Sequence, residues 1–260
     1  VGLRRSELDV TDPAAVAKVF ADVVPAIVVN AAAYTAVDAA ETDEAAAHAA
    51  NAVAPGLLAA EAAASGARLV HVSTDYVFAG DAALPYDEDA PTDPRSAYGR
   101  TKLAGEVAVL ERSPHAYVVR TAWVYGATGA NFVKTIAHLE RDRETVSVVD
   151  DQQGSPTWSQ DLARGLVALA RSAAPGGVYH CTNAGSTTWF RFTQAIFEEL
   201  GADPSRVLPT TTDAFPRPAP RPAYSVLGDR RWRAAGLPSM PHWRAALHAE
   251  GATGAPYRPL

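Results

Sequence analysis

The sequence predicts an α/β protein, namely a Rossmann-like doubly wound parallel sheet followed by a small C-terminal lobe. Short apolar runs alternate with longer helical patterns through most of the chain. A helix-length segment separates each run from the next, which is the spacing that parallel strands need. After Gly201 the alternation fades and Pro, Thr and Arg become frequent. We therefore expect a core in residues 1–182 and a substrate-binding lobe in residues 183–260, with parts of 122–160 contributing to the substrate site.

Local signals in the N-terminal half mark where each element begins and ends. Asp12 and Pro13 mark a helix start, since a polar cap and a proline in the first turn favour one. Ser65 and Gly66 close a long alanine-rich helix. The strands are short runs of branched apolar residues. In order, the expected elements are helix 11–24, strand 26–29, helix 43–64, strand 68–72, a polar loop over 80–94, a helix that starts at 96, and strand 116–120.

The C-terminal half continues the same alternation and then loses it. Its strands are again short and rich in Val, and its helices show apolar residues at helical spacing. The last two helices are short, which favours a small lobe packed on the sheet edge over a second Rossmann domain. In order, the expected elements are helix 130–139, strand 145–149, helix 159–170, strand 178–180, helix 188–200, and short helices at 230–235 and 242–248.

Composition limits the classes of partner and compartment. The chain has 260 residues, 48% of them hydrophobic, and a net charge of −6, which argues against a nucleic-acid polymer or an anionic membrane as partner. Cys181 is the only cysteine, so no disulfide forms within the chain and a reducing, cytoplasmic setting is expected. The first residues lack the apolar run of a secretory signal, and no stretch is apolar enough to span a bilayer.

Tyr98 and Lys102 are the most informative pair in the chain. They lie four residues apart on an expected helix, which places the phenol and the ammonium on one face, about one turn apart. A cation beside a phenol favours the phenolate, so we expect Lys102 to bring the pKa of Tyr98 closer to neutral. The chain has only three lysines, at 18, 102 and 134, among many arginines, which indicates a role that arginine does not fill. A surface tyrosine stacked on a lysine stem is the alternative.

A polar cluster, Ser73-Thr74-Asp75, follows the apolar run at 68–72. These residues either form a local turn, because all three types bond nearby backbone, or supply catalytic groups at the carboxyl end of a strand. With Tyr98 and Lys102 in the chain we favour the catalytic interpretation. The loop from Asn30 to Thr35 is in the same way either a tight connection or a cofactor contact, and its small residues favour the latter.

One expected motif is missing. Dinucleotide-binding sheets normally open with a strand, a glycine-rich turn and a helix, whose N-terminus receives the pyrophosphate. The chain contains neither G-x-x-G-x-x-G nor G-x-G-x-x-G. We therefore expect that the first strand–helix unit is absent from this polypeptide, since everything downstream fits the fold.

Several segments in order resemble the dTDP-4-dehydrorhamnose reductase family of extended short-chain dehydrogenases/reductases. The likeness runs from residue 1 into the C-terminal lobe, and the combination is much more specific than any single motif. The segments are DV at 9–10, VVNAAAYTAVD at 28–38, STDYVF at 73–78, YGRTKLAGE at 98–106, RTAWVY at 120–125, DQQGSPT at 151–157 and RP at 221–222.

The resemblance implies roles for the central residues. Tyr98 would be the proton donor, and Lys102 its partner and a ligand of the nicotinamide ribose. Thr74 would bond the C4 oxygen of the substrate, with Asp75 beside it, and Trp123 would line the sugar site. The reaction implied is hydride transfer from NADPH, or NADH, to the C4 ketone of dTDP-4-dehydro-L-rhamnose.

The resemblance also implies a cofactor-binding set beyond Tyr98 and Lys102. It consists of Asp9, Val10, Ala33, Tyr34 and Thr35.

Further interpretations concern residues around this site. Arg221 lies in a proline-rich stretch and is placed to reach a nucleotide diphosphate, although that stretch is also compatible with a polyproline ligand. Some family members carry an acidic cation ligand where this chain has Trp158-Ser159-Gln160, so we assign no metal. We expect a nucleotide sugar as partner and consider a homodimer possible.

Two alternative functions remain open at this point. One is a non-catalytic, NADP-binding regulatory subunit on the same fold, which the missing glycine-rich turn favours. The other is a related nucleotide-sugar 4-keto reductase or epimerase. The intact set of Thr74, Tyr98 and Lys102 favours an enzyme.

We predict that this 260-residue chain binds NADPH weakly, because its sequence supplies no glycine-rich turn for the pyrophosphate. Titration of the chain with NADPH, followed by nucleotide fluorescence, measures the affinity. A micromolar dissociation constant would contradict the prediction.

Overall fold

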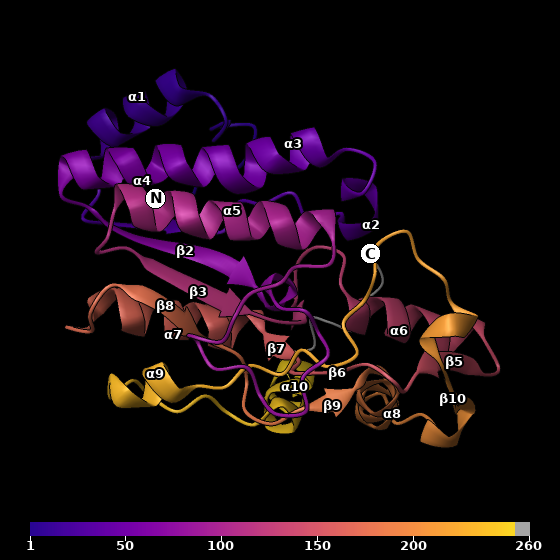
Figure 1. The fold of residues 1–260 in the computed structure, drawn as a ribbon. Coiled ribbons are helices and arrows are strands. Elements are labelled where there is room, and N and C mark those ends of the chain that lie inside the picture. The colour runs from indigo at the N-terminus through magenta and orange to yellow at the C-terminus, as the bar shows by residue number, and fades with distance from the viewer. Residues whose placement is uncertain (253–260) are drawn as a thin grey trace.

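The core is a parallel sheet of four strands in the order β1-β2-β3-β8. The computed structural model describes residues 1–252 and is drawn in Figure 1. All three strand pairs are parallel, with Val70 opposite Tyr117 and Val118 opposite Val178. The predicted doubly wound parallel sheet is therefore confirmed. The strands are β1 (Ile27–Asn30), β2 (Arg68–Thr74), β3 (Tyr117–Thr121) and β8 (Gly177–His180).

Most helices form where the sequence predicts them, with small differences at their ends, but the short helix over Val37–Ala40 was not predicted. Asp12 caps the first helix by accepting hydrogen bonds from Ala14 and Ala15, as its position predicts. The helices are α1 (Pro13–Val23), α2 (Val37–Ala40), α3 (Glu44–His48), α4 (Ala54–Ser65), α5 (Ala97–Arg112), α6 (Phe132–Asp142), α7 (Ser159–Arg171), α8 (Trp189–Glu199), α9 (Arg230–Ala234) and α10 (Trp243–Ala252).

The helix expected over residues 43–64 is interrupted by a π-helical turn, η1 (Ala49–Val53), between α3 and α4. Pro55 explains the interruption, because proline has no N–H to donate and its ring clashes with the carbonyl four residues earlier. That carbonyl belongs to Asn51, and it faces Gly105 of α5. The α-helical prediction was wrong over this turn, since helical periodicity does not distinguish the π form.

Helices cover both faces of the sheet (Figure 1). On one face, α1, α4 and α5 bury Leu69 and Val118. On the other face, α7 and Trp232 pack against Val70, Val119 and their neighbours. Successive side chains of a strand point to opposite faces of the sheet. Every second residue near the carboxyl ends of β2 and β3 therefore points to the face that α5 covers. That alternation places polar side chains of β2 and β3 under α5.

The C-terminal part contributes a second core. Its largest cluster is aromatic and combines residues of α6, α8 and α10, among them Phe192 and Phe197. The strand predicted at 145–149 forms as β5 (Val146–Val149), but it pairs with β10 (Val207–Thr210) and not with the main sheet. Short pairs complete the region: β4 (Val124–Tyr125) with β7 (Thr157–Trp158), and β6 (Gln153–Gly154) with β9 (Thr187–Thr188).

Three single 3₁₀ turns lie in the connections: η2 (Asp75–Val77), η3 (Pro204–Arg206) and η4 (Thr212–Ala214). Within residues 1–252, every helix is too short or too polar to cross a bilayer.

We predict that Gly105→Ala destabilises the protein, although alanine is the better helix former. An added Cβ would clash with the carbonyl oxygen of Asn51, which belongs to backbone and has little freedom to move. The expected loss is about 1–3 kcal/mol in the free energy of unfolding, as for other overpacked sites. Urea denaturation measures it, with Val107→Ala on the exposed side of α5 as the control. Equal or higher stability of Gly105→Ala would contradict the close packing.

Candidate functional site

The predicted catalytic side chains meet where β2 ends and α5 begins. Thr74 is the last residue of β2, and Asp75 opens the turn η2. The Thr74 hydroxyl donates to Asp75 Oδ1 at 3.0 Å and also hydrogen-bonds the phenol of Tyr98. Carboxyl ends of parallel strands are where this fold binds ligands. Thr74, Asp75 and Tyr98 therefore form one connected group at the expected edge of the sheet.

The start of α5 is fixed by two caps. The Ser96 side chain accepts from the Gly99 amide at 3.1 Å, and Glu41 accepts from the Ala97 amide at 2.8 Å. Gly99 packs directly against the carbonyl of Tyr76, where any Cβ would clash. These contacts hold the first turn of α5, and with it Tyr98, against η2.

Burial dominates the electrostatics of Tyr98. Burial raises the pKa of the phenol to about 12, the hydrogen bond with Thr74 opposes the rise, and the charge of Asp75 adds to it. The prediction that Lys102 lowers the pKa of Tyr98 was wrong, because the cost of burying a phenolate exceeds any help from the lysine. Tyr98 therefore carries its proton at neutral pH.

Lys102 points at the sheet beneath α5. Only 2% of the residue is exposed, and its Nζ donates to the carbonyl of Val72 at 2.7 Å. The same atom lies 3.5 Å from His71 Nε2. Burial lowers the pKa of Lys102 to about 8, and the carboxylate of Glu106 opposes that change. Lys102 therefore titrates close to neutral pH.

Asp75 is a buried carboxyl with a perturbed pKa. Burial raises its pKa to about 6, while the hydroxyls of Ser225 and Thr74 lower it in part. Ser225 belongs to the C-terminal region, and neither its hydroxyl nor Asp75 Oδ2 makes a hydrogen bond in the structure. A buried carboxyl beside polar hydroxyls in a hollow is a candidate for substrate binding.

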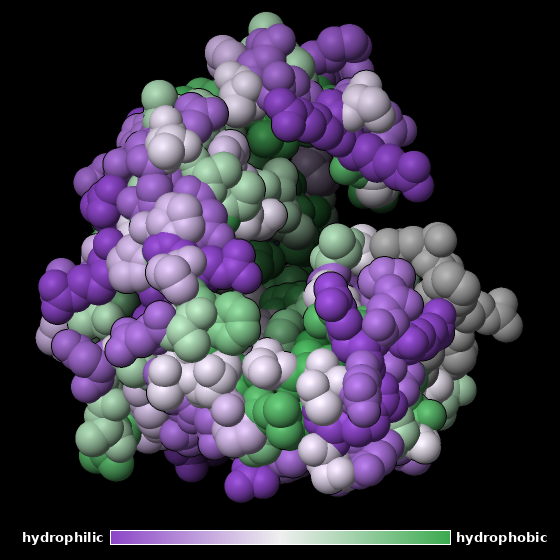
Figure 2. Space-filling model, turned by 90° about the vertical axis from the view of Figure 1, so that its right-hand side faces the viewer, coloured by the Kyte–Doolittle hydropathy of each residue, from purple (hydrophilic) through white to green (hydrophobic). Residues whose placement is uncertain are grey.

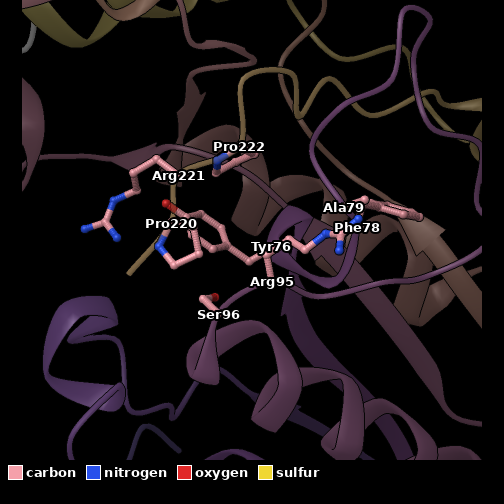
Figure 3. Close-up of a pocket in the computed structure, with 8 residues that line it drawn as sticks. All are labelled: Tyr76, Phe78, Ala79, Arg95, Ser96, Pro220, Arg221 and Pro222. Atoms are coloured by element: carbon pink, nitrogen blue, oxygen red, sulfur yellow. The ribbon is translucent and has the colours of Figure 1, made fainter. Parts of the chain in front are cut away.

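Arg221 lines a pocket together with Tyr76, the residue that follows Asp75. Its guanidinium forms an ion pair with Asp38 of α2 at 2.9 Å, and Asp38 also accepts from the Ala219 amide. A hollow lies between the two parts of the molecule (Figure 2). The ring of Tyr76 packs edge-on against Tyr98, with 5.5 Å between ring centres. The pocket of Figure 3 is lined by Tyr76, Phe78, Ala79, Arg95, Ser96, Pro220, Arg221 and Pro222.

Trp123 adopts a strained backbone conformation. Its φ is 48°, which is rare for a bulky residue and is often found at functional sites. Its indole stacks on Trp189 at 3.4 Å between ring centres and 7° between planes. Gly154 makes room for it, because a Cβ there would meet the indole. Trp123 thus belongs to the aromatic cluster of the C-terminal part, apart from the group around Tyr98.

The predicted cofactor loop is held by a residue that sequence reasoning missed. Asn51, in the π-helical turn, accepts from the Tyr34 amide at 2.8 Å and donates to the Tyr34 carbonyl and the Thr101 hydroxyl. This side chain therefore ties the loop to α5. Ala33 is partly buried and Thr35 is exposed. A single Asn in an alanine-rich helix was the available signal.

Asp9 and Val10 lie in the turn before α1. The exposed Asp9 accepts hydrogen bonds from the Thr11 amide and hydroxyl, which lower the pKa of its carboxyl. Val10 packs against the core between α1 and α4.

A buried ion pair lies below the site and was also missed. The Arg120 guanidinium binds both oxygens of Glu106, with a shortest distance of 2.7 Å, and the Ser73 hydroxyl donates to the same carboxylate. Lys102 and Glu106 share the helical spacing of Tyr98 and Lys102, so the pattern could have been extended by one turn. Among residues 1–252, no group of His, Cys, Asp and Glu side chains is arranged to hold a metal ion.

Comparisons with known proteins agree with this architecture. The chain matches the protein family described as RmlD substrate binding domain over residues 1–252. It is 57% identical to a probable dTDP-4,6-dihydroxy-2-methyloxan-3-one 4-ketoreductase of Streptomyces antibioticus, over 94% of this chain and 83% of that one. It is 56% identical to the dTDP-4-dehydrorhamnose reductase of Streptomyces griseus, over 94% and 82%.

A solved structure has a closely similar fold. The dTDP-4-dehydrorhamnose reductase from Bacillus anthracis in complex with NADP superposes with a TM-score of 0.93 at 39% identity. The match covers 96% of this chain and 89% of that one.

We predict that Asp75→Asn makes the fold more stable at neutral pH. The folded pKa of about 6 lies above the ordinary 3.8, so the fold favours the protonated carboxyl. That contribution is complete below pH 3.8 and is lost as pH rises through about 6. The variant should therefore gain about 1–3 kcal/mol at pH 7 and much less at pH 4. Urea unfolding of both proteins at the two pH values tests this, and a pH-independent difference would contradict it.

Proposed function

The chain belongs to the RmlD substrate binding domain family, and on that premise we propose that it is an NADPH-dependent reductase of a dTDP-4-keto sugar. The substrate we propose is dTDP-4-dehydro-L-rhamnose, reduced at its C4 ketone to dTDP-L-rhamnose. The observation that carries the proposal is the pairing of the half-buried Tyr98 with the buried Thr74 at the carboxyl end of β2.

The residues present fit a nicotinamide cofactor. An ammonium has three N–H donors, and the Val72 carbonyl accepts from Lys102 at 2.7 Å. The remaining donors suit the hydroxyls of a ribose. When bound, the cofactor supplies the hydride. Tyr98 and Lys102 would contact its ribose, and Ala33, Tyr34 and Thr35 at the end of β1 would border it.

Asp9 and Val10 complete the cofactor-binding set that we propose. NADPH is the preferred form in this proposal, and the NADP complex of the Bacillus anthracis relative supports it. NADH is the alternative.

The chain's own groups then handle the developing charge. As a ketone oxygen becomes alkoxide-like, hydroxyl donors aimed at it stabilise the transition state. Tyr98 is protonated at neutral pH and gives its proton to that oxygen, while Thr74 donates a second hydrogen bond. Lys102, whose pKa is about 8, holds a proton that is available near neutral pH. These roles assign Tyr98, Thr74 and Lys102 to catalysis.

Three residues would position the nucleotide sugar. Asp75 would accept a sugar hydroxyl beside Thr74. Trp123 would offer an apolar face to the sugar, and its strained backbone is consistent with a functional role. Arg221 would bind the diphosphate, for which a guanidinium is well suited.

A second candidate is reduction of a related dTDP-4-keto sugar. The relative from Streptomyces antibioticus, at 57% identity, bears the name of a 4-ketoreductase for a different sugar nucleotide. Comparison of kcat/KM for the two 4-keto sugars decides between them. The regulatory-subunit alternative is disfavoured by the presence of all three catalytic side chains.

We predict that Tyr98→Phe lowers turnover by about 10²–10⁴-fold, because general acids contribute factors of this size. Turnover is measured as NADPH oxidation with the 4-keto rhamnose nucleotide, at saturating NADPH. Tyr179→Phe is the control, since its phenol bonds the Pro175 carbonyl in the core on the opposite face of the sheet. Unchanged turnover in Tyr98→Phe would refute the acid role.

A further inference from the structure

A line of buried polar side chains runs beneath the proposed proton donor from β1 to α5. Asn30 Nδ2 lies 3.0 Å from His71 Nδ1, and His71 Nε2 lies 3.5 Å from Lys102 Nζ. The exposed fractions of the three residues are 5%, 0% and 2%. Buried polar groups of this kind need complementary donors and acceptors. The proposed function uses Lys102 and gives no role to Asn30 or His71.

The orientation of the Asn30 amide follows from its backbone neighbour. The Ala32 amide donates to the Asn30 side-chain oxygen at 3.1 Å. A backbone N–H requires an acceptor, so this contact identifies the oxygen, and the other end of the amide must be the NH₂ group. The NH₂ group is the one that faces His71, and it donates to Nδ1. His71 Nδ1 is therefore an acceptor and carries no proton.

A neutral imidazole with a bare Nδ1 has its proton on Nε2. Burial and the charge of Lys102 both lower the pKa of His71 well below its ordinary value, so the ring is neutral. The Nε2–H group thus faces Lys102 Nζ as a second donor. A protonated Nε2 cannot accept a hydrogen bond from the lysine ammonium, whereas in the opposite tautomer the bare Nε2 would accept one.

We propose that Asn30 and His71 are positioning residues for Lys102, and that Asn30 fixes the His71 tautomer so that the lysine donors stay available to the active site. The proposal rests on the proposed function for its catalytic meaning. An imidazole that accepted from Nζ would draw the ammonium towards β2 and away from the ribose and Tyr98. The donor tautomer instead leaves Val72 as the acceptor that anchors Lys102 on the strand.

The other groups near Lys102 do not replace this role. Glu106 lies one helical turn further along α5 and favours the ammonium, but Arg120 and Ser73 already occupy its carboxylate. Tyr98 is neutral on the same helix. Among the described residues, His71 is therefore the titratable ring in direct contact with Nζ. An N–H directed at Nζ favours the neutral amine over the ammonium, in the same direction as burial.

The first test reads the His71 tautomer directly in the full chain. Long-range ¹H–¹⁵N NMR of histidine-labelled protein distinguishes bare from protonated ring nitrogens. The His71 signals are assigned among the seven histidines by their loss in His71→Leu. We expect a protonated Nε2 and a bare Nδ1 from pH 8 to pH 5. A protonated Nδ1, or a charged ring at pH 7, would overturn the proposal.

The second test inverts the tautomer with an isosteric change. In Asn30→Asp the carboxylate has no N–H, so it accepts from His71 and forces the proton to Nδ1. His71 Nε2 then accepts from the Lys102 ammonium. We expect the tautomer to invert. We also expect the pKa of Lys102, measured by its ¹³Cε chemical shift as a function of pH, to rise by about one pH unit.

A matched control separates the tautomer from the added charge. Asn30→Asp is repeated in the His71→Leu background, where the charge remains but the imidazole is gone. In that background, most of the rise in the pKa of Lys102 should disappear. An equal shift in both backgrounds would mean that charge alone acts and would refute the proposal. If Asn30→Asp fails to fold, the wild-type tautomer decides the question.

The activity readout is separate. Asn30→Asp should raise the KM for NADPH more than it lowers kcat, because Lys102 is drawn from the ribose. The NMR results need neither cofactor nor sugar. Absence of sugar reduction would therefore count against the proposed function and leave the tautomer result standing.

Discussion

The close contact between α5 and the elements on either side of it is the constraint on which the site depends. Gly99 meets the carbonyl of Tyr76, and Gly105 meets the carbonyl of Asn51. No larger residue fits at either point, so the helix lies directly against the end of β2 and the π-helical turn. Lys102 lies between the two glycines and is buried as a result. The position of α5 thus sets the depth of both Tyr98 and Lys102.

The burial of these side chains in turn sets their protonation. Burial raises the pKa of Tyr98 and Asp75 and lowers that of Lys102, in each case towards the neutral form. A neutral phenol beside a hydroxyl suits donation to a carbonyl oxygen. The nearby charges of Glu106 and Arg120 neutralise one another, so that the site above them is left with weakly charged, hydrogen-bonding groups.

The C-terminal part closes the site from the other side. The ion pair of Arg221 with Asp38 joins it to α2, and the Ser225 hydroxyl lowers the pKa of Asp75 in part. The contacts between the two parts are polar, and the Arg221–Asp38 pair is partly exposed. Each part has an apolar core of its own.

The sequence by itself determined the parallel α/β fold, most of the helices and the main strands, because these follow from periodicity, caps and strand ends. The grouping of Thr74, Asp75 and Tyr98 was expected from the resemblance to a known family. Tertiary structure decided the pairing of β5 with β10, the π-helical turn at Pro55, and the contacts of Asn51, Glu106 and Arg120. It also decided the direction of the pKa shift of Tyr98, which burial raises although the spacing to Lys102 had predicted a lower value. The physical reason is that burial and long-range partners depend on how distant segments pack, and no local pattern records them.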